Sequence, residues 1–142
     1  MWSCPVCERK FKSNNQHHIC TTKDIGELFL DKSDELVLAF DRIMTVVMDW
    51  QPSFMGPSVN TIVFTNNKAW LIIKPMKKEL DIKFYHHERL ESSWIKKCSK
   101  NTWRYAYHLR VSNEEEMDKE FFELLRMGYD HAMLSKHDLI KE

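Results

Sequence analysis

The chain has 142 residues and a mass of 17.1 kDa, which suits one ordinary domain with a small appendage. Its hydrophobic fraction of 43% and charged fraction of 30% exclude a disordered chain, and its three glycines and four prolines exclude collagen-like and low-complexity segments. The sequence lacks an apolar run of roughly 18 residues and a basic-then-apolar leader, so we expect a cytoplasmic protein with no membrane partner.

The net charge of zero hides a segregation of charge along the chain. Residues 1–23 carry a balance of +3, residues 24–50 of −5, residues 51–112 of +7 and residues 113–142 of −5. A basic middle between acidic flanks is a feature that can select a partner, although the overall charge is neutral.

Residues 1–22 show no helical or strand periodicity and are predicted to form a knuckle of turns. A Cys-x-x-Cys motif at Cys4 and Cys7 is followed by His-x-Cys at His18 and Cys20, with His17 as an alternative ligand to His18. Mixed thiolate and imidazole ligands suit Zn²⁺, and four protein ligands leave no coordination position open for a substrate. We therefore predict one structural zinc ion held by Cys4, Cys7, His18 and Cys20, because the strand–helix layout of a redox Cys-x-x-Cys is not predicted here.

The first long helix is predicted to begin after Ser33, a favourable N-cap residue. Its core-facing stripe follows helical spacing and consists of Leu36, Val37, Phe40, Ile43, Met44, Val47 and Met48. Pro52, Gly56 and Pro57 predict a loop after it.

Four strands are predicted next, over residues 59–65, 68–74, 80–86 and 103–111, with a tight hairpin at Asn66 and Asn67. The last two strands alternate apolar and polar side chains, which is typical of an antiparallel sheet with one buried and one wet face. A second helix is predicted over 114–134, after an acidic start. The fold class is therefore α+β: a zinc knuckle over 1–22, then a two-layer domain over 23–142 of helix, four-stranded mostly antiparallel sheet and helix.

The motif Cys-Pro-x-Cys-x-Arg-x-Phe at residues 4–11, followed by Asn-Gln-x-His-x-Cys at 15–20, resembles the N-terminal knuckle of bacterial proteins that carry domain of unknown function 5655. The resemblance favours His18 over His17 and continues through Pro57, residues 74–84 and residues 108–111 to the acidic final helix. Val59 and Met76 stand where the resemblance leads us to expect basic residues. The family implies no established activity.

The best-supported binding surface is basic. We predict that it comprises Lys74, Lys77, Lys78, Lys83, Arg104, His108 and Arg110. Aromatic residues alternate with these cations along the strands, and positive charge beside exposed rings is the usual means of holding single-stranded nucleic acid.

Three arrangements could carry chemistry instead. Asp81 and Lys83 resemble half of a metal-dependent nuclease site, but the preceding hairpin has no acidic residue to complete it. His86, His87 and Glu88 are expected not to converge on one ion, because adjacent strand residues point to opposite faces. His108 could act as a general base, but the sequence assigns no carboxylate to orient it.

We therefore predict a non-enzymatic zinc-binding protein whose basic sheet face binds nucleic acid or another anionic ligand. The alternatives are a protein-interaction adaptor, an uncharacterised enzyme and a metal-handling protein. The last of these rests on acidic residues of the first helical region, namely Asp31, Asp34, Glu35 and Asp41. A concave basic face would favour an anion, and a flat apolar patch would favour a protein partner.

Overall fold

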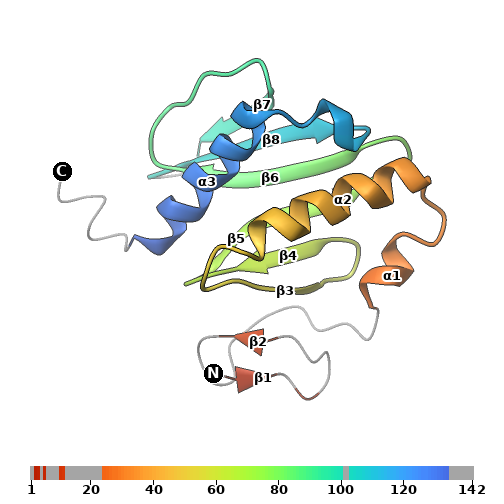
Figure 1. Ribbon diagram of the computed structural model, residues 1–142. Helices are drawn as coiled ribbons and strands as arrows, with labels where there is room; N and C mark the ends of the chain where they lie inside the picture. The colour runs from red at the N-terminus through yellow and green to blue at the C-terminus, as the bar shows by residue number, and fades with distance from the viewer. Residues whose placement is uncertain (1, 4, 6–9, 12–23, 101–102, 135–142) are drawn as a thin grey trace.

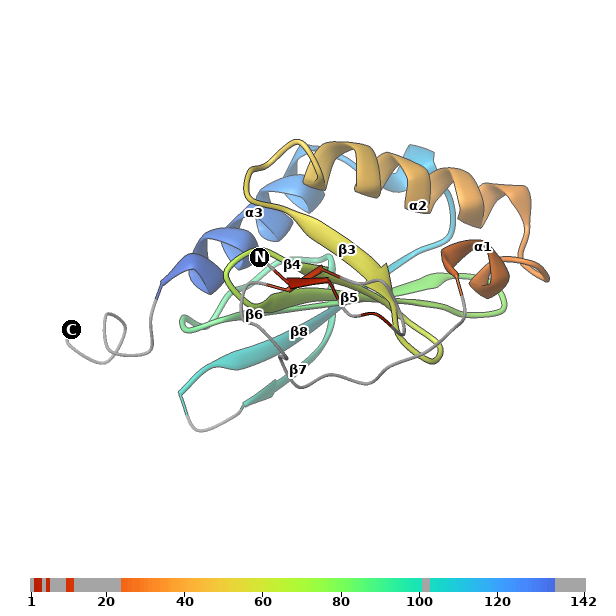
Figure 2. The ribbon, with the colours of Figure 1, turned by 90° about the horizontal axis from the view of Figure 1, so that it is seen from below.

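The computed structural model describes residues 2–3, 5, 10–11, 24–100 and 103–134 (Figure 1). In these residues, two helices cover one face of a six-stranded antiparallel sheet, so the α+β class and the two-layer arrangement are confirmed (Figure 2). A separate antiparallel pair, β1 (Trp2–Ser3) and β2 (Lys10–Phe11), lies in the segment that the sequence predicts to consist of turns. Cys4, Cys7, His17, His18 and Cys20 lie outside the described residues, so the zinc knuckle stays a prediction.

The large sheet has the order β3-β4-β5-β6-β8-β7. Its strands are β3 (Phe54–Pro57), β4 (Ile62–Thr65), β5 (Ala69–Pro75), β6 (Leu80–His86), β7 (Ile95–Lys100) and β8 (Tyr105–Val111). The four predicted strands correspond to β4, β5, β6 and β8, and the predicted count of four is too low because β3 and β7 extend the sheet at its two edges. The hairpin at Asn66 and Asn67 joins β4 to β5 as expected.

Helix α2 (Asp34–Val47) begins after Ser33, whose Oγ accepts a hydrogen bond from the Leu36 N–H. Its buried residues are Leu36, Ala39, Phe40, Ile43 and Val47, the stripe that packs on the sheet. A short helix, α1 (Ile25–Leu28), precedes it and was not predicted.

The second predicted helix is divided. A 3₁₀ turn, η1 (Glu114–Glu116), has a capping box between Asn113 and Glu116, and α3 (Lys119–Met133) begins after Asp118. Asp118 Oδ1 accepts a hydrogen bond from the Phe121 N–H at 2.9 Å, which makes Asp118 the N-cap and separates α3 from η1.

The hydrophobic core lies between the helices and the sheet. Alternate residues of β6, such as Leu80, Ile82 and Phe84, are fully buried in it, while Asp81, Lys83 and Tyr85 between them point to the other face and are half-buried. The face of the sheet away from the helices, here called the open face, thus carries the polar side chains of the strands.

No helix in the described part of the chain is both long and apolar enough to cross a membrane.

Candidate functional site

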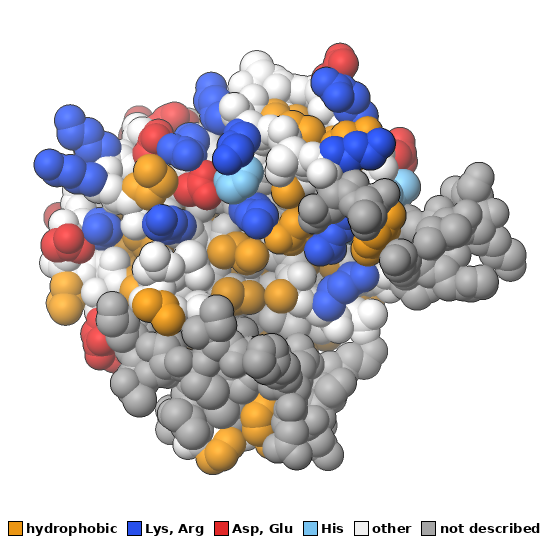
Figure 3. Space-filling model, turned by 180° about the vertical axis from the view of Figure 1, so that it is seen from behind, with side chains coloured by type: hydrophobic (Ala, Val, Ile, Leu, Met, Phe, Trp, Pro, Cys, Tyr) orange, Lys and Arg blue, Asp and Glu red, His pale blue; other side chains and the backbone are white. Residues whose placement is uncertain are grey.

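The open face gathers basic side chains from three adjacent strands. The register places Lys83 of β6 opposite His108 of β8, and His108 opposite Lys97 of the edge strand β7. Side chains opposite each other in an antiparallel pair are close neighbours, so these three form one row across the sheet. Figure 3 views this face and shows Lys and Arg side chains around a histidine and a strip of hydrophobic side chains.

An aromatic residue lies beside this row. The guanidinium carbon of Arg104 is 3.9 Å from the ring centroid of Tyr85, and Lys83 Nζ is 5.3 Å from the same centroid. Lys83 is on the same strand as Tyr85, whereas Arg104 lies just before β8. The Tyr85 ring is therefore contacted by cations from two separate segments of the chain. Both distances are within the range of cation–π attraction, which holds these cations beside the ring.

Two of the predicted basic residues are engaged by carboxylates. Arg110 Nε donates to Asp81 Oδ1 at 2.7 Å, and Arg110 Nη1 donates to Glu79 Oε1 at 2.9 Å. The Glu79 contact is the main reason that the pKa of Arg110 lies above its usual range, and Asp81 adds to it. His108 Nδ1 lies 3.1 Å from Asp81 Oδ2. The positive charge at this end of the open face is thus partly neutralised.

The β5–β6 hairpin carries the remaining predicted cations. Lys74 is exposed at the end of β5, opposite Asp81 in the register. Lys77 and Lys78 are exposed in the turn that follows, where the Met76 N–H donates to the Glu79 carbonyl at 2.9 Å. These three lysines extend the basic surface past the ends of strands β5 and β6.

The geometry supplies the carboxylate that the sequence did not assign to His108. Asp81 is two strand positions before Lys83 and reaches His108 from the neighbouring strand, a contact that follows from the β6–β8 register. The cross-strand neighbours of His108 are Lys83 and Lys97, which are cations and not hydroxyl or thiol nucleophiles. Asp81 therefore orients the His108 ring, and the two lysines place positive charge on either side of it.

A metal-dependent nuclease would need a second acidic residue beside Asp81. On the neighbouring strands, Asp81 instead faces Lys74 and Arg110. Among the described residues, the side chains able to converge on one ion do not include Asp81 or any acid of the first helical region. Asp34 and Glu35 are exposed in the first turn of α2, where their negative charges interact favourably with the positive end of the helix dipole.

A second cluster contradicts one of the sequence expectations. His86, His87 and Glu88 offer ligand atoms that all lie within 4.8 Å of one another, although they were expected to diverge. The alternation of faces holds only within a strand, and β6 ends at His86. The chain bends there, so that the rings of His86 and His87 stack with centroids 4.6 Å apart.

His131 of α3 completes this histidine cluster. It is only 2% exposed, and its Nδ1 lies 3.1 Å from His87 Nδ1. Burial, followed by the nearby His86 and His87 and then by Lys68 and Arg104, lowers the pKa of His131 to about 4. No sequence pattern marks this residue, because a histidine on the buried stripe of a helix does not indicate which loop it contacts.

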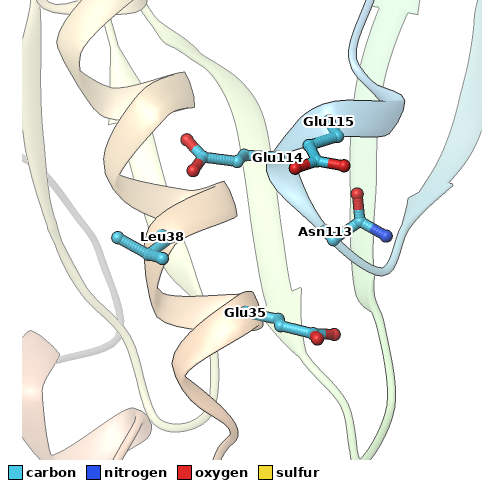
Figure 4. A pocket seen from close by; sticks show the side chains of 5 residues that line it. All are labelled: Glu35, Leu38, Asn113, Glu114 and Glu115. Atoms are coloured by element: carbon cyan, nitrogen blue, oxygen red, sulfur yellow. The ribbon is translucent and has the colours of Figure 1, made fainter.

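A small pocket between α2 and η1 has the wrong charge for an anion. It has a volume of about 210 Å³ and is lined by Glu35, Leu38, Asn113, Glu114 and Glu115 (Figure 4). Three of these five residues are acidic and none is basic, so the pocket is not part of the basic surface.

Comparisons with known proteins give one match. The model of the family described as domain of unknown function (DUF5655) matches residues 25–132. No curated protein and no solved structure matches the chain. The matched residues include all six strands of the large sheet, the whole of α2 and all but the last residue of α3.

Proposed function

The chain belongs to the DUF5655 family, whose description carries no activity, and from this premise we propose that the open face of its sheet binds single-stranded nucleic acid or a similar polyanion. The observation that carries the proposal is that Lys83 and Arg104 contact the ring of Tyr85 on the face where Lys97 lies opposite His108. Nucleic-acid phosphates are neutralised by such cations, and bases stack on such planar groups.

The first support is the convergence of charge. Lys83 and Lys97 flank His108 in one cross-strand row. Asp81 and Glu79 engage Arg110, whereas Lys83, Lys97 and Arg104 form no ion pair with a carboxylate within the described residues. We therefore place the phosphate backbone over Lys83, Lys97 and Arg104.

The second support is the aromatic platform. Arg104 lies over one face of the half-buried Tyr85 ring, so a planar cation and an aromatic ring stand side by side on the open face. Arginine planes and aromatic rings both stack on unpaired bases, which are accessible in single strands and hidden in duplexes. A single-stranded ligand therefore suits this face better than a duplex.

The third support is what the open face lacks. Among the described residues, the exposed large hydrophobic side chains are Leu30, Val37, Leu38, Val59, Met127, Met133 and Leu134. None of these belongs to a strand, so the strip of hydrophobic side chains on the open face (Figure 3) lacks the strongly exposed large residues that are typical of a protein-binding patch.

We further propose that Cys4, Cys7, His18 and Cys20 hold one structural Zn²⁺ next to this domain. The ligand types and their spacing support this assignment.

Fluorescence anisotropy tests the proposal. Labelled single- and double-stranded DNA and RNA of about 15 nucleotides would be titrated with the full chain at roughly 50 to 200 mM salt. We expect single strands to bind more tightly than duplexes, with an affinity that falls steeply as the salt concentration rises. Lys83→Ala and Lys97→Ala should each weaken binding and reduce the salt slope by about one.

Lys119→Ala is the matched control, because Lys119 is an exposed lysine at the start of α3 on the helical side. It should bind like the unmodified protein. Absence of binding at low salt, or an equal effect of all three lysine variants, would refute the open face as the nucleic-acid surface and leave a protein partner as the next candidate.

A further inference from the structure

We propose that His86, His87 and Glu88 form a binding site for a divalent transition-metal ion, separate from the N-terminal zinc knuckle, and that His131 holds the ring of His87 in place. The three side chains offer ligand atoms within 4.8 Å of one another. The site lies where β6 ends, beside α3, and does not depend on the nucleic-acid surface proposed above.

The separation of the first ligand pair already fits a metal ion. His87 Nε2 lies 3.4 Å from Glu88 Oε1. Tetrahedral zinc ligands with bonds of about 2.0–2.1 Å are separated from one another by about 3.3 Å. An ion between these two atoms therefore requires little movement of either side chain.

The other nitrogen of His87 has the partner that a metal-bound histidine usually has. Its Nδ1 lies 3.1 Å from Nδ1 of the buried His131. Histidine ligands commonly donate their second ring N–H to an acceptor, which fixes the tautomer and the direction of the ring. We therefore assign His87 Nε2 as the ligand atom and His131 as a positioning residue.

The buried side of the histidine cluster contains a polar atom whose hydrogen-bonding capacity is not used. His131 Nε2 is buried and has no hydrogen-bond partner in the described residues. A buried polar atom without a partner is unfavourable and calls for an explanation. When His131 Nδ1 accepts the His87 proton, the hydrogen of the neutral ring is on Nε2, so this unpaired N–H is the cost of the contact that positions His87.

His86 is the third ligand and must rearrange slightly. It is 7% exposed, and its Nδ1 accepts a hydrogen bond from the Glu88 N–H at 3.1 Å. Metal binding by this ring replaces that hydrogen bond, and the N–H of Glu88 can then turn to solvent because Glu88 is exposed.

The ligand set selects the class of ion. Two imidazoles and one carboxylate suit Zn²⁺, Co²⁺, Ni²⁺ or Cu²⁺, whereas Mg²⁺ and Ca²⁺ prefer all-oxygen sites. The Glu88 side chain is 69% exposed, so the outer side of the site faces solvent. Three protein ligands leave at least one coordination position for water or for an anionic group.

Cobalt binding to the full chain tests the site. Protein loaded with only one equivalent of Zn²⁺, which fills the thiolate-rich knuckle and leaves the histidine site open, would be titrated with Co²⁺, and binding would be followed by calorimetry and by visible absorption. We expect one equivalent of Co²⁺ to bind with nitrogen and oxygen ligands and without the intense thiolate charge-transfer band that a knuckle site would give. Glu88→Gln and His87→Asn should each weaken this binding at least tenfold.

Glu91→Gln is the matched control, since Glu91 is an exposed glutamate in the same loop and outside the cluster. It should bind Co²⁺ like the unmodified protein. Equal Co²⁺ binding by Glu88→Gln and the unmodified protein, or a thiolate charge-transfer band on the added ion, would overturn the proposal. If His87→Asn fails to fold, the exposed Glu88→Gln variant still decides the question.

Discussion

Gly128 stands where α3 approaches β6 most closely. A Cβ atom at this position would lie 2.8 Å from Phe84 Cδ2 and 3.1 Å from Phe84 Cβ. Phe84 is fully buried and therefore has no free space to move into. The missing side chain of Gly128 is thus a packing requirement of the helix–sheet contact.

We expect Gly128→Ala to destabilise the protein. Overpacking costs about 1–3 kcal/mol, and the better helix propensity of alanine returns about 1 kcal/mol. Chemical denaturation should therefore show a net loss on the order of 1 kcal/mol in the free energy of unfolding. Met127→Ala, at a partly exposed neighbouring position, is the control and should change stability less. A Gly128→Ala variant as stable as the parent would contradict the close contact with Phe84.

The buried His131 predicts a loss of stability in mild acid. Its pKa of about 4 in the folded state lies below the ordinary value of 6.5. Between these values the unfolded chain binds a proton that the folded chain does not, so the contribution is fully present above pH 6.5 and is lost as the pH falls toward 4. His86, whose pKa burial also lowers, acts in the same direction.

Denaturation of the chelator-treated protein at pH 7 and pH 5 measures this effect. His131 alone should account for a loss of roughly 2 kcal/mol over this interval. His131→Phe keeps an aromatic ring among His86, His87 and Trp103 but cannot titrate, so its stability should depend less on pH. An equally steep dependence in His131→Phe would assign the effect to other groups.

The alternation of side chains along individual strands was enough to predict most of the residues on the open face, but it could not predict the histidine cluster. Strict alternation in β6 and β8 placed Lys83, His108 and Arg110 on the polar face. The pairing of Asp81 with His108 depends on the register between strands, which alternation alone does not fix. The meeting of His87 with His131 depends on a bend after β6 and on the docking of α3, neither of which has a sequence pattern.

At the scale of elements, a buried hydroxyl fixes the first part of the connection from β6 to β7, whose second part is tied to α3 by Ser92 and Trp94. Tyr107 of β8 accepts a hydrogen bond from the Leu90 N–H at 2.7 Å and donates one to the Glu88 carbonyl at 2.8 Å. The same residue Glu88 contributes its carboxylate to the proposed metal site. Tyr107 thus links the central strand β8 to the loop that carries that site.

We expect Tyr107→Phe to lower the free energy of unfolding by about 1–3 kcal/mol, because it leaves two backbone groups of the loop without their partner. Hydrogen exchange should show faster exchange at the Leu90 amide, while amides in the centre of β6 stay protected. Tyr105→Phe, on the same strand, is the control. If the Leu90 amide exchanges at the same rate in Tyr107→Phe, this hydroxyl does not hold the loop.

The elements that were predicted from sequence differ from those that were missed in how much apolar surface they bury. β4, β5, β6 and β8 have a buried face and therefore a visible apolar pattern. The edge strand β7 is exposed at five of its six residues, so it carries Lys96, Lys97 and Lys100 in place of such a pattern. Charged edge strands oppose pairing with other chains. The other edge strand, β3, contains Gly56 and Pro57, residues that normally indicate a loop.

For the whole molecule, the segregation of charge along the sequence becomes a segregation by layer. Acidic residues begin α2 and η1 and line the pocket between them, whereas the open face carries the cations of β5 to β8 (Figure 3). A polyanion would be attracted to one side of the molecule and repelled from the other. The orientation of a bound nucleic acid is therefore set by the fold as a whole, beyond the contacts of single residues.

The last prediction concerns the expected division of the chain into an N-terminal zinc knuckle and an α+β domain. In the described part of the chain, the hydrophobic core and the side chains packed on it come from residues after Asp24. The family match likewise begins at residue 25. We therefore expect the α+β domain to keep its fold when the knuckle loses its metal.

Cys7→Ser removes one predicted zinc ligand and Cys98→Ser, at the exposed free cysteine of β7, is the control. Elemental analysis should find about one zinc ion per chain fewer in Cys7→Ser than in Cys98→Ser, a comparison that cancels any zinc held by the histidine cluster. Near-ultraviolet circular dichroism and the thermal midpoint should stay close to those of the control, because the buried aromatic residues Trp70, Phe84 and Tyr107 belong to the domain. Equal zinc content in both variants would contradict the ligand assignment. Loss of the near-ultraviolet signal together with the zinc would show instead that the knuckle and the sheet fold as one cooperative unit.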